Sequence, residues 1–74
     1  MEVLLFGIIA EKAGMGSMGV EASSTHELIR ALTARIPELE HLSYALAVDR
    51  TVVIDDRPLT GSEELALIPP FAGG

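Results

Sequence analysis

SSTHELIRALTARIP, residues 23–37, carries the clearest secondary-structure signal in the chain, that of an amphipathic helix. Ser24 and Glu27 have the spacing of a capping box, in which the serine oxygen accepts from the Glu27 amide and the carboxylate accepts from the Ser24 amide. Apolar residues then recur at intervals of three and four: Leu28, Ile29, Leu32 and Ile36. Pro37 disfavours helical geometry at the residue before it, so we expect one main helix at about 24–36.

Apolar and β-branched segments on either side of this helix predict a sheet. EVLLFGII (2–9) is almost continuously apolar, which predicts a central strand buried on both faces. AEKAGMGSMG (10–19) contains three glycines and predicts a loop, with a single helical turn at 10–13 as the most it would form. SMGVEAS (17–23) is a weaker strand that would form a hairpin with the first.

After the helix, PELEHL (37–42) predicts a single turn, and DDRPLTG (55–61) has the composition of a turn. Further strands are predicted at YALAVD (44–49), TVVI (51–54) and EELALI (63–68). The first and last strands are the most apolar, so we expect them at the centre of the sheet, paired in parallel.

The predicted fold class is α+β, with a mixed sheet of four to five strands and one main helix packed on one face. Residues 1–68 form the domain in this interpretation, and residues 69–74 form an extended tail. The length of 74 residues allows one domain only.

Composition narrows the possible functions. The chain has no cysteine, which excludes disulfides and thiolate chemistry. It carries 11 acidic against 5 basic residues, a net charge of −6, which argues against nucleic acid as a partner. Its longest apolar run is too short to span a membrane, and it begins without the basic leader of a signal peptide. We therefore expect a cytoplasmic protein.

Candidate catalytic side chains are few. His26 and His41 lie fifteen positions apart with no motif around them, which favours two surface histidines. The adjacent carboxylates Asp55–Asp56 and Glu63–Glu64 point to opposite sides of an extended chain, so neither forms an acid/base pair. Asp49 close to Asp55–Asp56 is a weak hypothesis for a cation site, and solvated turn carboxylates are the favoured interpretation.

The end of the chain, LALIPPFAGG (65–74), offers a different kind of chemistry. Pro69 and Pro70 favour a stiff, extended arm, and Gly73 and Gly74 make its tip narrow enough to enter a channel in another protein. The reactive group would be the terminal carboxylate of Gly74, once ATP-dependent adenylation gives it a good leaving group. The alternative is a frayed terminus without function.

The segment AVDRTVVIDDRPLTGSEELALIPPFAGG (47–74) resembles the C-terminal part of the MoaD family, the small subunit of molybdopterin synthase. Its Pro-Pro-x-x-Gly-Gly end is the specific part of the likeness. VLLFGIIAEKAG (3–14) is similar to the family's first strand and following turn. Phe71 departs from the pattern, because it is bulkier than the usual valine.

The resemblance implies a β-grasp, ubiquitin-like fold and a sulfur carrier. An E1-like activating enzyme (MoeB-like) would use ATP to adenylate Gly74, which then becomes a thiocarboxylate. The tail would enter the large catalytic subunit (MoaE-like), with Pro69, Pro70, Phe71 and Ala72 docked in its channel and Gly73 keeping the approach narrow. The large subunit would supply the catalytic side chains for sulfur transfer to the pterin precursor. This chain itself would bind no cofactor or metal.

Other functions stay open at the level of sequence. They are a sulfur carrier for thiamine or amino-acid biosynthesis, a ubiquitin-like modifier joined to lysines, and a plain interaction module. The proline pair favours the molybdopterin branch. An exposed apolar patch for partners is expected from Phe6, Leu59, Leu67, Ile68 and Phe71. Burial in the core is the favoured alternative for Phe6 and Leu67.

Overall fold

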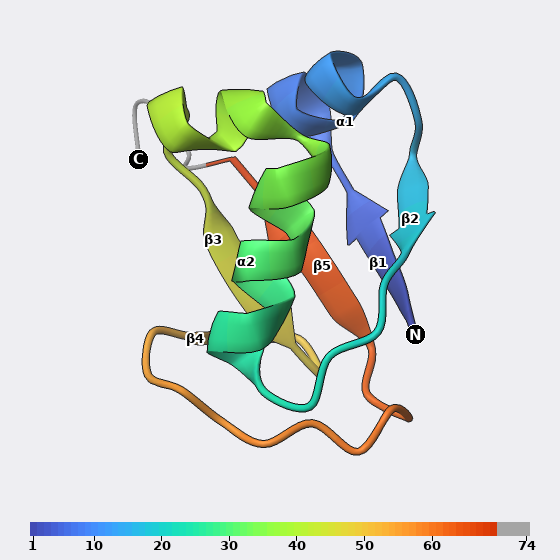
Figure 1. Ribbon diagram of the computed structural model, residues 1–74, viewed down its shortest axis with the longest axis vertical. Coiled ribbons are helices and arrows are strands. Elements are labelled where there is room, and N and C mark those ends of the chain that lie inside the picture. Colours follow the sequence, from blue (N-terminus) through green and yellow to red (C-terminus); the bar gives the residue numbers. More distant parts are fainter. Residues whose placement is uncertain (70–74) are drawn as a thin grey trace.

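The computed structural model describes residues 1–69, and the predicted tail beyond Pro69 lies outside this range (Figure 1). Five strands and three helical segments follow one another along the chain. In order they are β1 (Glu2–Leu5), α1 (Gly7–Ala13), β2 (Ser17–Gly19), α2 (Thr25–Arg35), the 3-10 helix η1 (Pro37–His41), β3 (Ala45–Val48), β4 (Thr51–Val53) and β5 (Leu65–Ile68).

The strands form one mixed sheet in the order β2-β1-β5-β3-β4. β1 and β5 run parallel, with Leu5 opposite Leu67, and every other neighbouring pair is antiparallel. The predicted fold class is therefore confirmed, together with the inner position of the first and last strands and the hairpin of β1 and β2. β5 lies at the centre of the sheet.

The helix α2 lies across one face of the sheet (Figure 1). The core fills the space between them and includes Val3, Ile9, Leu28, Leu32, Ile36, Leu65 and Leu67, each at most 1% exposed. The prediction that the first strand is buried on both faces is wrong. Exposure alternates along β1, so that Val3 and Leu5 are buried while Leu4 is exposed. The helical layer covers one side only, which leaves the other side of the sheet open.

The main helix follows its prediction closely. Ser24 is the N-cap, and its hydroxyl accepts from the Glu27 amide at 3.2 Å. The second half of the capping box is displaced by one residue, because the Glu27 carboxylate accepts from the Ser23 amide at 2.7 Å and not from that of Ser24. The helix ends at Arg35, just before Pro37, and the helical turn predicted at 37–42 is present as the 3-10 helix η1.

The segment 2–9 does not form one strand, and 10–19 is only partly a loop. β1 ends at Leu5, and the chain turns into α1 at Gly7, whose φ of +56° is in the left-handed region. Gly14 ends α1 with a φ of +73°. The turn places Ile9 in the core, where it is completely buried. This burial stabilises a helix that is too short to show apolar periodicity in the sequence.

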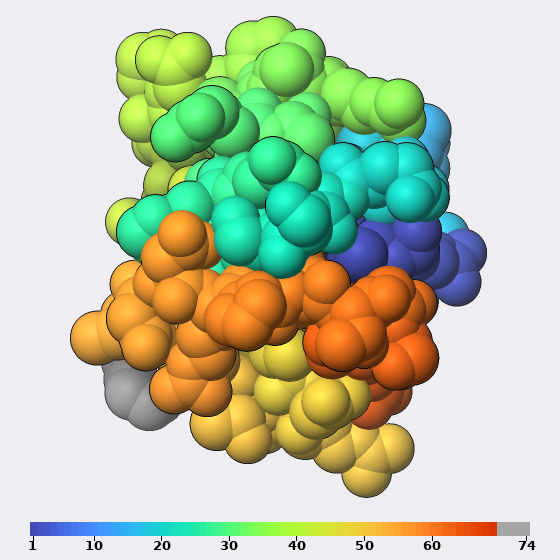
Figure 2. All heavy atoms as spheres, turned by 60° about the horizontal axis from the view of Figure 1, so that its bottom comes forward, coloured from blue at the N-terminus to red at the C-terminus, as the bar shows by residue number. Residues whose placement is uncertain are grey.

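The connection between β3 and β4 is a two-residue turn in which Asp49 (φ 50°) and Arg50 (φ 67°) are both left-handed. Such turns match the twist of a hairpin. The next connection, residues 54–64, has no regular element and lies against the start of α2 (Figure 2). Thr25 holds it there: its hydroxyl donates to the Asp55 carbonyl at 3.0 Å and accepts from the Arg57 amide at 2.9 Å.

Candidate functional site: an open groove beside the tail root

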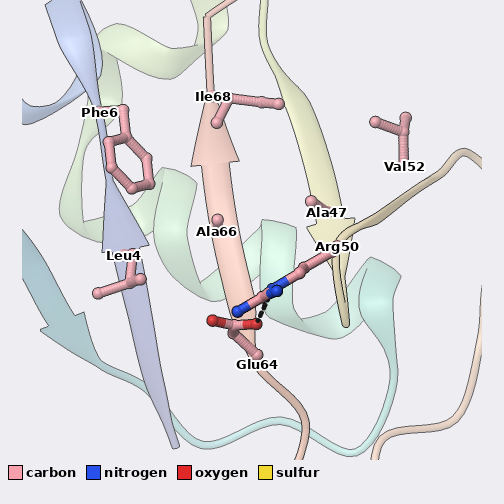
Figure 3. Close-up of a pocket in the computed structure, with 8 residues that line it drawn as sticks. All are labelled: Leu4, Phe6, Ala47, Arg50, Val52, Glu64, Ala66 and Ile68. Carbon is pink, nitrogen blue, oxygen red and sulfur yellow. Dashed lines mark hydrogen bonds and ion pairs between the residues drawn. The ribbon is translucent and has the colours of Figure 1, made fainter.

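The uncovered face of the sheet carries a groove of about 280 Å³, here called the open groove. Its walls come from β1, β3, β4, β5 and the residues next to them: Leu4, Phe6, Ala47, Arg50, Val52, Glu64, Ala66 and Ile68. Figure 3 shows these side chains in front of the strands, with the helix behind. The open groove therefore lies on the side of the sheet opposite α2.

The hollow follows from the size of the residues at its floor. Ala47 and Ala66 are partners in the β3–β5 register, and their small side chains leave space at the middle of the sheet. Larger side chains rise on both sides, Phe6 over β1 and Val52 on β4 (Figure 3). Phe6 is 47% exposed and Val52 is 53% exposed. Exposed apolar patches of this kind mark interaction sites in small soluble domains.

The two ends of the open groove differ in chemistry. Phe6 and Ile68 make one end apolar, whereas Arg50 and Glu64 form an ion pair at the other, with 3.1 Å between Nε and Oε1 (Figure 3). Both charged side chains are exposed, so the pair contributes little to stability. It does place a cation and an anion where a partner's polar groups could contact them at the rim.

Ile68 is the last residue of β5, and the partly buried Pro69 follows it, so the tail begins at the apolar end of the open groove. Because β1 and β5 are parallel, both strands end at the same edge of the sheet. Gly7 lies against Pro69 there: a Cβ atom built on Gly7 would come within 2.9 Å of Pro69 Cγ. We call Pro69 and this contact the tail root.

The structure brings together some of the predicted patch and separates the rest. Phe6 and Ile68 both line the open groove, so the favoured burial of Phe6 is wrong. Leu67 is completely buried, as favoured, and Leu59 is 9% exposed and packs in the core, so the expectation of an exposed Leu59 is wrong. Pro70, Phe71, Ala72, Gly73 and Gly74 lie outside the described residues.

Several groove residues escaped the sequence analysis: Leu4, Ala47, Arg50, Val52, Glu64 and Ala66. The sequence pattern that exposes them can be interpreted only once the order of the strands and the position of the helix are known. One helix of 11 residues cannot cover both faces of a five-stranded sheet. Alternate residues of the two most apolar strands must then face outward.

The acidic side chains have structural roles. Asp49 accepts from the Glu64 amide at 2.9 Å, and among residues 1–69 no three His, Asp or Glu side chains are placed to hold a metal. The hypothesis of a cation site at Asp49 is therefore wrong. The His26 amide donates to Asp56 at 3.0 Å and holds the pKa of that carboxyl below its ordinary value. Thr60 amide donation similarly lowers the pKa of Glu63.

A second hollow, of about 360 Å³, lies on the outer side of α2 and is lined by His26, Ile29, Arg30 and Thr33. Its lining residues within the described part of the chain all belong to α2. Within the described part of the chain, no helix is long and apolar enough to cross a membrane.

The sheet order, the helix across one face and the tail that leaves the central strand define a ubiquitin-like β-grasp protein. The model of the ThiS family matches residues 3–74, and the chain belongs to this family. No match was found among curated proteins.

Solved structures of similar fold cover nearly the whole chain. Small archaeal modifier protein 1 (SAMP1) from Haloferax volcanii is 24% identical with a TM-score of 0.82, over 99% of this chain and 97% of that one. The same-named protein from Methanosarcina acetivorans is 19% identical with a TM-score of 0.84, over 99% and 94%. A chain from the complex of subunits 1 and 2 of molybdopterin-converting factor from Helicobacter pylori 26695 is 24% identical with a TM-score of 0.72, over 99% and 96%.

At these identities the structural likeness establishes the fold. Together with the family match it supports a class of function, that of a sulfur carrier or ubiquitin-like modifier of the ThiS and MoaD type.

Proposed function

We propose that this chain is the sulfur-carrying small subunit of a molybdopterin synthase and that the carbonyl carbon of Gly74 is the carrier atom. The observation that supports this function is the position of the open groove. Its apolar end, formed by Phe6 and Ile68, adjoins Pro69, where the PPFAGG segment begins. A large subunit that covers the groove would hold the protein right beside the start of its tail.

Activation requires a MoeB-like enzyme and ATP, and the cytoplasm is the location that we propose for it. A carboxylate oxygen of Gly74 attacks the α-phosphorus of ATP, and pyrophosphate leaves. Sulfide then attacks the carbonyl carbon, the C–S bond forms, and AMP leaves as the bond to its oxygen breaks. The product is a thiocarboxylate, and the missing side chains of Gly73 and Gly74 leave its carbon accessible.

The thiocarboxylate sulfur then bonds to a carbon of the pterin precursor inside the large subunit, and water cleaves the acyl–sulfur bond, which leaves the sulfur on the pterin and returns the Gly74 carboxylate. Side chains of the large subunit supply the acid–base chemistry. This chain contributes the delivery arm and the docking surface. The similar chain from Helicobacter pylori was solved in a complex of subunits 1 and 2 of molybdopterin-converting factor, which supports a large-subunit partner for this chain.

The carrier chemistry is tested by intact-mass spectrometry. After incubation with the activating enzyme, ATP and a sulfur source, the protein is expected to gain one sulfur in place of one oxygen. Deletion of Gly74, or addition of one residue after it, is expected to abolish this exchange and leave thermal unfolding unchanged. Absence of exchange in the unaltered chain, or normal exchange in the extended variant, would refute the mechanism.

The docking surface is tested with two variants of equal exposure. Phe6 and Met15 are each 47% exposed, but only Phe6 lines the open groove. A buried aromatic anchor contributes more than about 1.4 kcal/mol to binding, so Phe6→Asp is expected to weaken binding to the large subunit by about tenfold or more. Met15→Asp is expected to leave the affinity unchanged. Equal affinities of the two variants would place the interface elsewhere.

A second candidate is a ubiquitin-like modifier, favoured by the two small archaeal modifier proteins among the neighbours. Both functions begin with the same adenylate at Gly74. They differ in the group that attacks the adenylate: a lysine amine attacks it in the modifier, and a sulfur nucleophile attacks it in the sulfur carrier. Isopeptide-linked adducts in cell extract, with no thiocarboxylate, would favour the modifier. A carrier for thiamine or amino-acid biosynthesis would form the thiocarboxylate but fail to sulfurate the pterin precursor.

A further inference from the structure

The tail root contains a close contact between Gly7 and the ring of Pro69. Leu5 of β1 is opposite Leu67 of β5, and continuing this parallel register by two residues brings Gly7 opposite Pro69. A Cβ atom at Gly7 would lie 2.9 Å from Pro69 Cγ, 3.6 Å from Cδ and 3.9 Å from Cβ. The proline ring therefore occupies the space that a side chain at position 7 would need.

Two independent constraints act on Gly7. Its φ of +56° is a conformation that residues with a side chain rarely adopt, and its open side is filled by the Pro69 ring. Gly14, at the other end of α1, has only the first constraint, because its φ is +73° but no atom of the described residues, its chain neighbours aside, lies within 4 Å of the added Cβ. The two glycines thus separate backbone strain from contact with the tail.

We propose that Gly7 is a positioning residue for the tail, forming a notch that seats the Pro69 ring and sets the direction in which PPFAGG leaves the sheet. The effect on sulfur transfer rests on the proposed function, whereas the contact between Gly7 and Pro69 does not. Proline lacks an N–H group and fixes its own φ, so Pro69 cannot extend the β5 ladder, and the seat of its ring orients the next residues.

A side chain at position 7 would force the ring to move, because a contact of 2.9 Å is shorter than carbon atoms allow. The shift occurs at the base of an arm whose tip lies five residues further along, roughly 16 Å if extended. Misplacement of a reacting group by about 1 Å can cost 10²-fold in rate. An arm aimed wrongly in the free protein enters the partner's channel less often, which raises KM more than it lowers kcat.

The experiment compares Gly7→Ala with Gly14→Ala, in the natural chain and in a Pro69→Ala background. Thiocarboxylate formation by the activating enzyme is followed by intact mass at several carrier concentrations. Gly7→Ala is expected to lower kcat/KM at least tenfold, chiefly through KM, while Gly14→Ala stays within twofold of the natural chain. Pro69→Ala removes the Cγ and Cδ atoms, so in that background Gly7→Ala is expected to have no larger effect than Gly14→Ala.

A second measurement is independent of activity. Proton NMR of the natural chain is expected to show nuclear Overhauser contacts between the Gly7 α-protons and the Pro69 ring. The Pro69 ring resonances are expected to shift in Gly7→Ala but not in Gly14→Ala. If the natural chain shows the contacts but forms no thiocarboxylate, the proposed function fails and the notch stands.

If the natural chain forms the thiocarboxylate and Gly7→Ala matches Gly14→Ala, the positioning role is overturned and the carrier function stands. If Gly7→Ala does not fold, the positioning role is tested by the double variant with Pro69→Ala and by the Overhauser contacts in the natural chain. Absence of those contacts would overturn the notch.

Discussion

Thr25 is the one buried polar residue in the described part of the chain, being 2% exposed, and its hydroxyl joins α2 to the connection before β5. It donates to the Asp55 carbonyl at 3.0 Å and accepts from the Arg57 amide at 2.9 Å. Thr25→Val keeps the branched shape and removes the hydroxyl. Both backbone groups then lose their partner at a site that water reaches poorly.

The magnitude follows from these two groups. Leaving a buried donor or acceptor unpaired costs about 1–3 kcal/mol, and both hydrogen bonds here are partly buried, so we expect a total loss of about 2–3 kcal/mol. A chain of 74 residues has a free energy of unfolding of roughly 4–11 kcal/mol. Thr25→Val is therefore expected to remove about a fifth or more of the stability.

Thr33 provides a matched control on the same helix. Its hydroxyl donates to the Ile29 carbonyl at 2.8 Å, one turn back along α2. Such bonds within a helix add little, so Thr33→Val is expected to change stability by less than about 0.5 kcal/mol. Thr25→Ser keeps the hydroxyl and loses one methyl group, with an expected loss of about 1 kcal/mol.

The assay is urea unfolding followed by circular dichroism, since the chain has no tryptophan. The midpoint and slope together give the free energy of unfolding for each variant. The reasoning is refuted if Thr25→Val stays within about 0.5 kcal/mol of the natural chain, or if Thr33→Val is equally destabilising. In the second case the loss would come from valine in a helix and not from the unpaired groups.

Three further changes test the fold. Leu67→Ala, at a completely buried position of β5, is expected to cost about 2–5 kcal/mol in the same titration, whereas Ile54→Ala, at a 92% exposed position, is expected to cost less than about 0.5. Ser24→Ala removes the N-cap of α2 and is expected to cost about 1 kcal/mol. Amide donation from Thr60 lowers the pKa of Glu63 from its ordinary 4.5, so its contribution to stability is present above that pH and is lost as the pH falls through the lower folded value. Glu63→Gln is expected to flatten the fall in stability below pH 4.5, measured by urea unfolding across the acid range, and an unchanged slope would contradict this.

The sequence predicted those parts of the fold that local signals specify. The cap at Ser24 and the stop at Pro37 bound α2 within one or two residues, because both act through the backbone of their immediate neighbours. The parallel pairing of β1 with β5 followed from their apolar character, since the most apolar strands gain most from an inner position.

The sequence predicted only one turn of α1, at 10–13, and missed its start at Gly7 for a physical reason. β-branched and aromatic residues from Val3 to Ile9 favour a strand, and a seven-residue helix buries one residue, Ile9, which is too few to show a period. The contact at this turn is tertiary: the ring of Pro69, more than sixty positions away in the chain, packs against Gly7. Local residue propensities contain no information about such a long-range contact.

The exposure of Phe6 and the function of the tail are connected through the place of β5 in the sheet. β5 is bonded on both sides, to β1 and to β3, and its last residue, Ile68, is opposite Ala45. The base of the tail is therefore fixed to the same rigid surface that forms the open groove. In the proposed function, a partner that binds the groove fixes Pro69 at the same time, so docking and delivery of Gly74 depend on one surface. In that function a β-grasp protein takes part in the reaction through its main-chain terminus, because its sheet determines where its tail begins.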